Sequence, residues 1–235
     1  MKKPYHDIII EECGEPLISI PTGELVLELP HPYKSLGADY GDKSPYCLRL
    51  GVVNALLEAQ RHLQLLQPGW RLKIFDAYRP VSVQQFMVDY TFAQVVQKQG
   101  VNPKELSEEN TQAIWQQVYE IWAMPSNNPA TPPPHSTGAA VDLTLVDEKG
   151  QTVDFGGEID ELSMRSHPNY YLHSGTEEGQ IYDARRELLH QVMTQGGFLR
   201  HPGEWWHFSL GDQMWTWQHN LEHYDLPLTA RYGRV

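Results

Sequence analysis

The chain has 235 residues, of which 40% are hydrophobic and 20% charged, and its formal net charge at pH 7 is −12. This composition is typical of a globular protein that is long enough to bury a substantial core. The excess of acidic residues and the lack of any basic run argue against a nucleic-acid surface, because phosphate contacts require clustered Lys and Arg.

Membrane and secretory signals are missing from the sequence. No stretch approaches the roughly 20 apolar residues of a membrane span, and the N-terminal MKK is followed by an apolar run of only three residues, Ile8–Ile10. We therefore expect a cytoplasmic protein without a membrane partner. Cys13 and Cys47 lie far apart and predict free thiols rather than a disulfide.

The local patterns predict an α+β fold in which helices pack on a mainly antiparallel sheet, because strands and helices do not alternate one for one. We expect one domain over residues 1–235, with residues 1–43 as an N-terminal extension packed on it. Apolar periodicity and turn residues predict the elements in chain order. In the first half they are strand-like pieces at 8–10 and 25–29, a helix from Ser44-Pro45 to Gly69, a strand at 71–75, a helix from a Ser82 capping box to Lys98, and a helix opening at Asn102-Pro103. A proline-rich connector at 125–134 follows. The second half has a hairpin at 140–155, a loop at 156–178, a helix through 181–192 that ends at Gly196-Gly197, and a strand at 205–210.

Two segments carry the candidate chemistry. His135 follows the proline-rich connector, and Asp142 lies in the apolar run AVDLTLV, where a buried carboxylate needs a partner or a metal. Gly138 and its alanine neighbours are small enough to let the backbone approach a metal or substrate.

The second segment is Glu204-Trp-Trp-His207. Residues three apart on a strand face opposite ways, so we expect Glu204 in the turn after Pro202-Gly203 and His207 in the strand. His207 would then bind a metal while Glu204 reaches a water molecule. The two tryptophans either shield the site or simply pack in the core.

Two imidazoles, one carboxylate and a spare glutamate predict a catalytic zinc site with an open position for water. Iron(II) also accepts two histidines and a carboxylate, but such sites usually begin with His-x-Asp, which is missing here. Arg79 could stabilise an oxyanion or pair with Asp76. The pairs His219/His223 and His167/His173 lack an acidic partner in a comparable setting, and we interpret them as solvated or structural.

Four motifs occur in order, namely DAYRP at 76–80, HSTGAAVDLTL at 135–145, DELSMRSH at 160–167 and GEWWHF at 203–208. With them the chain, from about Tyr33 to Leu210, resembles the D-alanyl-D-alanine dipeptidases. These are zinc metallopeptidases of cell-wall (peptidoglycan) metabolism and vancomycin resistance, within the D,D-peptidase and hedgehog-like zinc fold. The DELSMRSH loop points to the dipeptidase branch. One departure is Pro133, where the family commonly has serine.

The resemblance implies one zinc ion per chain and hydrolysis of D-Ala-D-Ala to two D-alanines, with the dipeptide as a small-molecule partner. Alternatives are a D,D-carboxypeptidase, a dipeptidase for other D-amino acid pairs, or a non-catalytic zinc-bearing binding module. The implied roles are zinc ligation by His135, Asp142 and His207, general base catalysis by Glu204, stabilisation of the tetrahedral intermediate by Arg79, and recognition of the free amino group by Asp160 with help from Tyr33.

Overall fold

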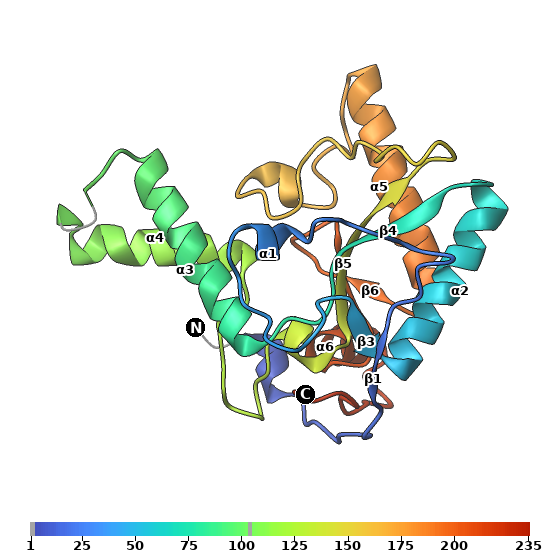
Figure 1. Cartoon of the computed structure of the whole chain (residues 1–235), viewed down its shortest axis with the longest axis horizontal. Coiled ribbons are helices and arrows are strands. Elements are labelled where there is room, and N and C mark those ends of the chain that lie inside the picture. The colour runs from blue at the N-terminus through green and yellow to red at the C-terminus, as the bar shows by residue number, and fades with distance from the viewer. Residues whose placement is uncertain (1–2, 103–104) are drawn as a thin grey trace.

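A five-stranded sheet forms the centre of the computed structural model, which describes residues 3–102 and 105–235 (Figure 1). Its order is β2-β4-β5-β7-β6, and only the β2–β4 pair is parallel. This confirms the expected α+β class with a mainly antiparallel sheet. The strands are β2 (Val26–Leu27), β4 (Arg71–Asp76), β5 (Ala140–Val146), β6 (Leu199–Arg200) and β7 (His207–Ser209), and a separate two-stranded sheet joins β1 (Leu17–Ser19) to β3 (Cys47–Arg49).

Two groups of helices flank the sheet. Helices α2 (Leu50–Leu66) and α5 (Glu177–Gln195) pack on it through the larger hydrophobic cluster, while α3 (Val81–Lys98) and α4 (Glu108–Ile121) form a second cluster on the other side (Figure 1). Short helices complete the fold, namely α1 (Pro32–Ser35), α6 (Gln213–Glu222), and the 3-10 helices η1 (Pro4–Asp7), η3 (Pro134–Thr137) and η4 (Met164–Ser166).

Several predicted boundaries were wrong. Helix α2 begins at Leu50, because the residues after Ser44-Pro45 pair as strand β3. Pro80 rather than Ser82 is the N-cap of α3, so the capping box does not form. Helix α4 begins at Glu108 behind a Ser107 cap, and the predicted opening at Asn102-Pro103 falls partly outside the described residues.

Three further elements also differ from expectation. The predicted strand at 8–10 is reduced to one bridge, between Ile10 and Ala230, after η1. The return strand of the predicted hairpin is likewise one bridge, between Val146 and Thr152. Helix α6 was not predicted. Among the described residues there is no helix with the length and apolar character to cross a membrane, and both cysteines are free.

Candidate active site

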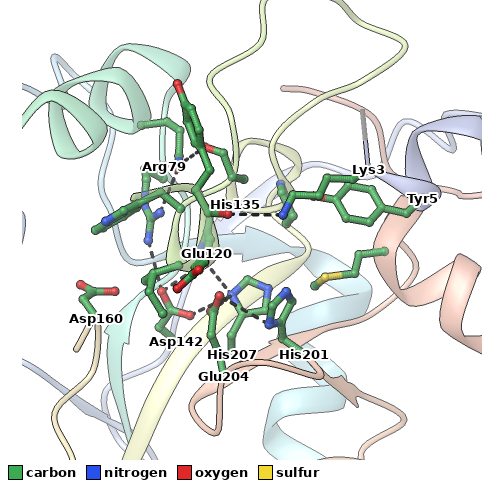
Figure 2. Close-up of a pocket in the computed structure, with 17 residues that line it drawn as sticks. Lys3, Tyr5, Arg79, Glu120, His135, Asp142, Asp160, His201, Glu204 and His207 are labelled. Carbon is green, nitrogen blue, oxygen red and sulfur yellow. Dashed lines mark hydrogen bonds and ion pairs between the residues drawn. The ribbon is translucent and has the colours of Figure 1, made fainter. Parts of the chain in front are cut away.

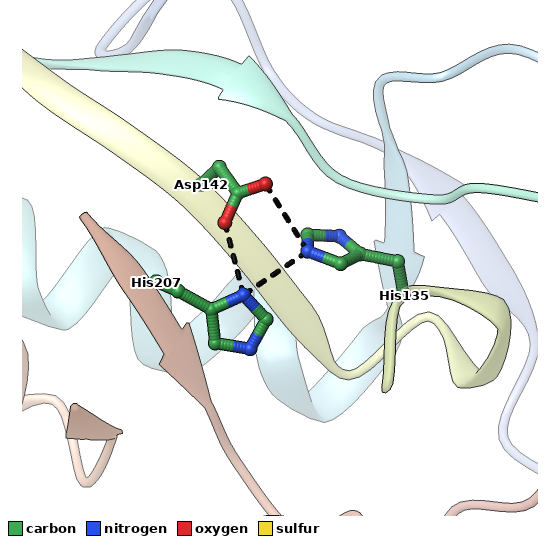
Figure 3. Close-up of side chains that lie close together, drawn as sticks. All are labelled: His135, Asp142 and His207. Carbon is green, nitrogen blue, oxygen red and sulfur yellow. Dashed lines mark hydrogen bonds and ion pairs between the residues drawn. The ribbon is translucent and has the colours of Figure 1, made fainter. Parts of the chain in front are cut away.

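His135, Asp142 and His207 come together from three elements, η3, β5 and β7 (Figure 3). Nε2 of His135 lies 3.2 Å from Nδ1 of His207 and 3.2 Å from Asp142 Oδ2, and Asp142 Oδ1 lies 3.0 Å from Nδ1 of His207. All three side chains are buried. Donor atoms about 3.3 Å apart are expected around a tetrahedral ion with bonds of about 2.0–2.1 Å.

Hydrogen bonds behind the rings direct both imidazoles into this cluster. His135 Nδ1 lies 2.7 Å from the Ala77 carbonyl and must donate its proton there, which leaves Nε2 unprotonated in the neutral ring. The Ser209 hydroxyl oxygen lies 3.4 Å from His207 Nε2 and can accept a proton from it when that nitrogen carries the proton of the neutral ring. Nδ1 of His207 is then free for a cation, and the donor set fits a metal.

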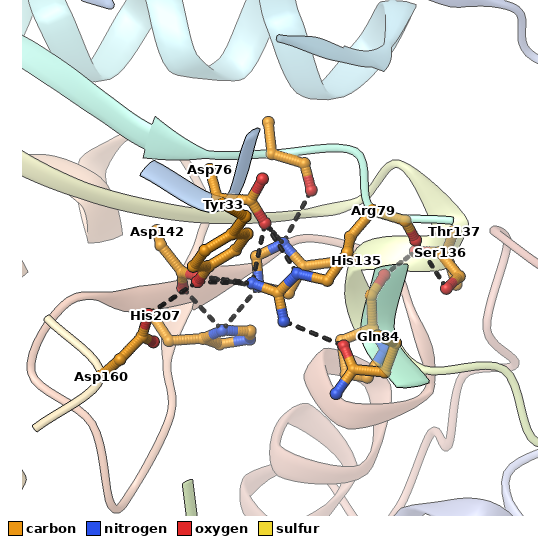
Figure 4. Close-up of polar contacts among 12 residues, drawn as sticks. Tyr33, Asp76, Arg79, Gln84, His135, Ser136, Thr137, Asp142, Asp160 and His207 are labelled. Carbon is orange, nitrogen blue, oxygen red and sulfur yellow. Dashed lines mark hydrogen bonds and ion pairs between the residues drawn. The ribbon is translucent and has the colours of Figure 1, made fainter. Parts of the chain in front are cut away.

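Arg79 lies between two buried carboxylates (Figure 4). Its guanidinium contacts Asp76 Oδ2 at 2.7 Å and Asp142 Oδ2 at 3.2 Å. Burial opposes ionisation of Asp142, but His135 and His207 outweigh burial and lower its pKa. The pKa of Asp76 is also lowered, because Arg79 and neighbouring histidines outweigh its burial. The ion pair weighed for Arg79 with Asp76 is therefore present.

Glu204 lies beside the cluster, in the turn before β7 as expected. Its Oε2 is 3.8 Å from His207 Nδ1, and its Oε1 is 3.4 Å from Nδ1 of His201. Burial is the main cause that raises the pKa of Glu204 well above its ordinary value, and the charges of Asp142 and Asp160 add to it. A carboxylate that holds a proton this readily suits proton transfer.

Asp160 and Tyr33, far apart in sequence, are in direct contact. The Tyr33 hydroxyl donates to Asp160 Oδ2 at 2.8 Å. Burial, followed by the charge of Asp142, raises the pKa of Asp160 to about 7. Its φ of 64° makes it the one described non-glycine residue with a positive φ. Strained residues of this kind cluster at functional sites.

Arg186 of α5 tethers the loop that carries Asp160. It is fully buried and donates to the carbonyls of Phe155 and His167, each at 2.9 Å. The predicted polar loop is thereby held against α5 at its start and near its middle.

One cavity is lined by six of the predicted site residues, whereas Tyr33 lies outside its lining (Figure 2). The six are Arg79, His135, Asp142, Asp160, Glu204 and His207. The cavity encloses about 590 Å³ of space between atoms, including the open solvent at its mouth. Further lining residues, outside the sequence motifs, come from the N-terminus, from the end of α4 and from the segment before Glu204. They include Lys3, Tyr5, Tyr119, Trp122 and His201. Only their position in the fold identifies them, since none lies within a ligand-like pattern.

Three further expectations about this region had different outcomes: core packing is the alternative that holds for the tryptophans, the role expected of Gly138 was wrong, and His219 and His223 join no metal set among the described residues. Trp205 and Trp206 do not line the cavity, and both pack in the larger core cluster, where Trp205 stacks on Phe155. Gly138 has a φ of 71°, and a Cβ there would clash with the Leu17 side chain, so its small size serves packing rather than approach to the site. The His219 and His223 rings stack on each other, and the described part of the chain groups only His135, Asp142 and His207 as a metal-binding set.

An α+β fold that holds two histidines and an aspartate beside a buried glutamate is typical of metal-dependent hydrolases. A family model described as D-ala-D-ala dipeptidase matches residues 27–226. The chain belongs to this family of metallopeptidases.

Named relatives are similar over various lengths. A D-alanyl-D-alanine dipeptidase of Synechocystis sp. is 54% identical over 99% of this chain and 97% of its own. Dipeptidases of the same name from Enterococcus faecalis and Escherichia coli are 30% and 34% identical, over 69% and 60% of this chain and 72% and 56% of their own. A solved LD-carboxypeptidase aligns with 92% of this chain and 76% of its own, at a TM-score of 0.46 and 14% identity.

Proposed function

We propose that the protein is a zinc-dependent dipeptidase that hydrolyses D-alanyl-D-alanine to two D-alanines. The observation that carries this proposal is the placement of a His–Asp–His cluster, a buried glutamate and a buried aspartate around one cavity. Similarity to the dipeptidases named above supports the substrate.

His135, Asp142 and His207 would hold the zinc through Nε2, a carboxylate oxygen and Nδ1. When bound, zinc supplies a Lewis acid that lowers the pKa of a water molecule and polarises the scissile carbonyl. Glu204 Oε2, near the same nitrogen of His207, would take a proton from the attacking water and later give it to the leaving amine.

Arg79 and Asp160 would orient the substrate. The Arg79 guanidinium keeps its charge, since Tyr33 and two aspartates outweigh its burial, and its position at the cavity suits stabilisation of the negative charge that develops on the carbonyl oxygen. Asp160, with the Tyr33 hydroxyl on its Oδ2, would bind the free ammonium of the dipeptide. We also propose that residues 1–235 act as one peptidase domain.

Two of the three alternatives make different demands on these residues. A D,D-carboxypeptidase cleaves N-blocked peptides, and would leave the buried Asp160 without an ammonium partner. A non-catalytic zinc-bearing module needs neither Glu204 nor Arg79 at the cavity. A dipeptidase for other D-amino acid pairs would use the same groups and differ only in the walls of the cavity.

The test is release of D-alanine by the zinc-loaded protein from D-Ala-D-Ala and from its N-acetylated form, side by side. We expect release from the free dipeptide alone. Cleavage of the acetylated form would support the carboxypeptidase, and failure to cleave either by a zinc-loaded protein would refute the proposed substrate. D-Val-D-Ala and D-Ala-D-Val measured in parallel report the breadth of specificity.

A further inference from the structure

The cavity is lined by one ammonium group that has no carboxylate partner. Arg79 and Lys3 both line the cavity. Arg79 is held by two aspartates, whereas the Lys3 side chain hydrogen-bonds the backbone carbonyl of Tyr119 at 3.3 Å. Within residues 3–102 and 105–235, no ion pair includes Lys3. A charged group next to a cavity without a counter-charge is suited to bind a ligand of opposite charge.

The segment that carries Lys3 is anchored to the rest of the fold. Gln213 of α6 donates to the carbonyl of Ile8 at 2.7 Å, directly after η1, and Ile10 bridges Ala230. Tyr5 is buried and lines the same cavity. The position of Lys3 is therefore defined by packing, which a binding residue requires.

Lys3 and Asp160 lie on opposite sides of the cavity. Figure 2 shows them at its two ends, with Glu204 and the His–Asp–His cluster between them. In a zwitterionic dipeptide the ammonium and the carboxylate lie on opposite sides of the peptide bond, so the cavity presents the complementary charges in matching order.

We propose that the Lys3 ammonium binds the C-terminal carboxylate of the substrate. The cavity then holds a free dipeptide between Asp160 and Lys3, with its peptide bond at Glu204 and the metal cluster. This inference rests on the proposed function and makes Lys3 a residue that determines specificity for a free carboxylate. A charge-assisted hydrogen bond to a carboxylate corresponds to about a 10- to 100-fold difference in binding.

The test compares D-Ala-D-Ala with D-alanyl-D-alanine amide, which lacks the carboxylate and still releases one D-alanine on cleavage. Lys3→Met removes the positive charge and keeps a side chain of nearly the same length, whereas Lys3→Arg retains the charge. Lys149→Met is the matched control, because Lys149 lies in an exposed turn away from the cavity. Calorimetric binding of both ligands to the zinc-loaded Glu204→Gln protein, with and without Lys3→Met, gives a readout that is independent of turnover.

We expect the wild type and Lys149→Met to prefer the acid over the amide by about 10- to 100-fold in kcat/KM. Lys3→Met should bring this preference close to one by raising KM for the acid alone, and Lys3→Arg should retain most of it. An unchanged preference in Lys3→Met would overturn the assignment of Lys3 while the dipeptidase activity stands. If the wild type cleaves neither ligand and Glu204→Gln binds neither, the proposed function fails and the role of Lys3 fails with it.

Discussion

Asp142 and His207 lie directly opposite each other on β5 and β7, with Oδ1 of the aspartate 3.0 Å from Nδ1 of the histidine. On the other side of β5, Asp76 of β4 lies opposite Asp142, next to a register shift between Ile74 and Asp76. A register slip of one residue would turn a side chain to the other face of the sheet. The geometry of the site therefore depends on the pairing of three strands, and the irregularity in β4 places Asp76 in this row.

Glu204→Gln should keep zinc and lose most of its turnover. The amide retains the shape of the side chain but cannot accept a proton from water, and general base catalysis typically contributes about 100- to 10,000-fold to the rate. Zinc content by mass spectrometry and kcat for D-Ala-D-Ala would be measured together. Glu222→Gln, at the exposed end of α6, is the control, and normal turnover in Glu204→Gln would exclude Glu204 as the base.

Ser209→Ala should weaken zinc binding without changing any ligand. The variant removes the hydroxyl that lies 3.4 Å from His207 Nε2, and loss of such a contact behind a metal ligand typically costs about 10- to 100-fold in affinity. Competition with a chromophoric chelator measures the zinc Kd. Ser174→Ala, in the loop before α5, should bind zinc as the wild type does. An unchanged Kd in Ser209→Ala would mean that this link does not orient His207.

Arg79→Ala should destabilise the metal-free protein, because Asp76 and Asp142 would remain buried without the cation between them. Removing one partner from a buried ion pair typically lowers the free energy of unfolding by about 3–5 kcal/mol. Arg79→Lys should recover only part of this loss, since an ammonium cannot replace the planar guanidinium that contacts both acids. Urea denaturation at pH 7 is the measurement, and wild-type stability of Arg79→Ala would contradict the structural role.

Asp160 should make the stability of the metal-free protein depend on pH. Its pKa of about 7 in the folded state exceeds the value of an unfolded aspartate, so the folded protein binds the extra proton. The stabilisation by this proton is complete below about pH 4 and is lost as pH rises toward 7. Between pH 5 and pH 8, the wild type should therefore lose at least about 1 kcal/mol of unfolding free energy relative to Asp160→Asn. Urea titrations of both proteins at the two pH values test this, and parallel pH dependences would contradict it.

Much of this protein could be predicted from local patterns. The apolar run at 140–146, the turn after Pro202-Gly203 and the alternation at 71–75 each indicated one element correctly, because burial and turn chemistry act over a few residues. The fold class followed from the order of these elements. The residue types in the two short motifs indicated a metal, because two imidazoles and a carboxylate near a glutamate have few other common uses.

Only the tertiary structure decided which additional groups share the cavity and what each one contacts. The N-terminal Lys3 reaches the site through packing of η1 against α6, and Arg79 bridges Asp76 and Asp142 because strand pairing brings the two aspartates together. The same long-range packing placed Trp205 in the core and replaced the expected start of α2 with strand β3. Such contacts join residues far apart in the chain, and their energies depend on burial and pairing that no local window of sequence contains.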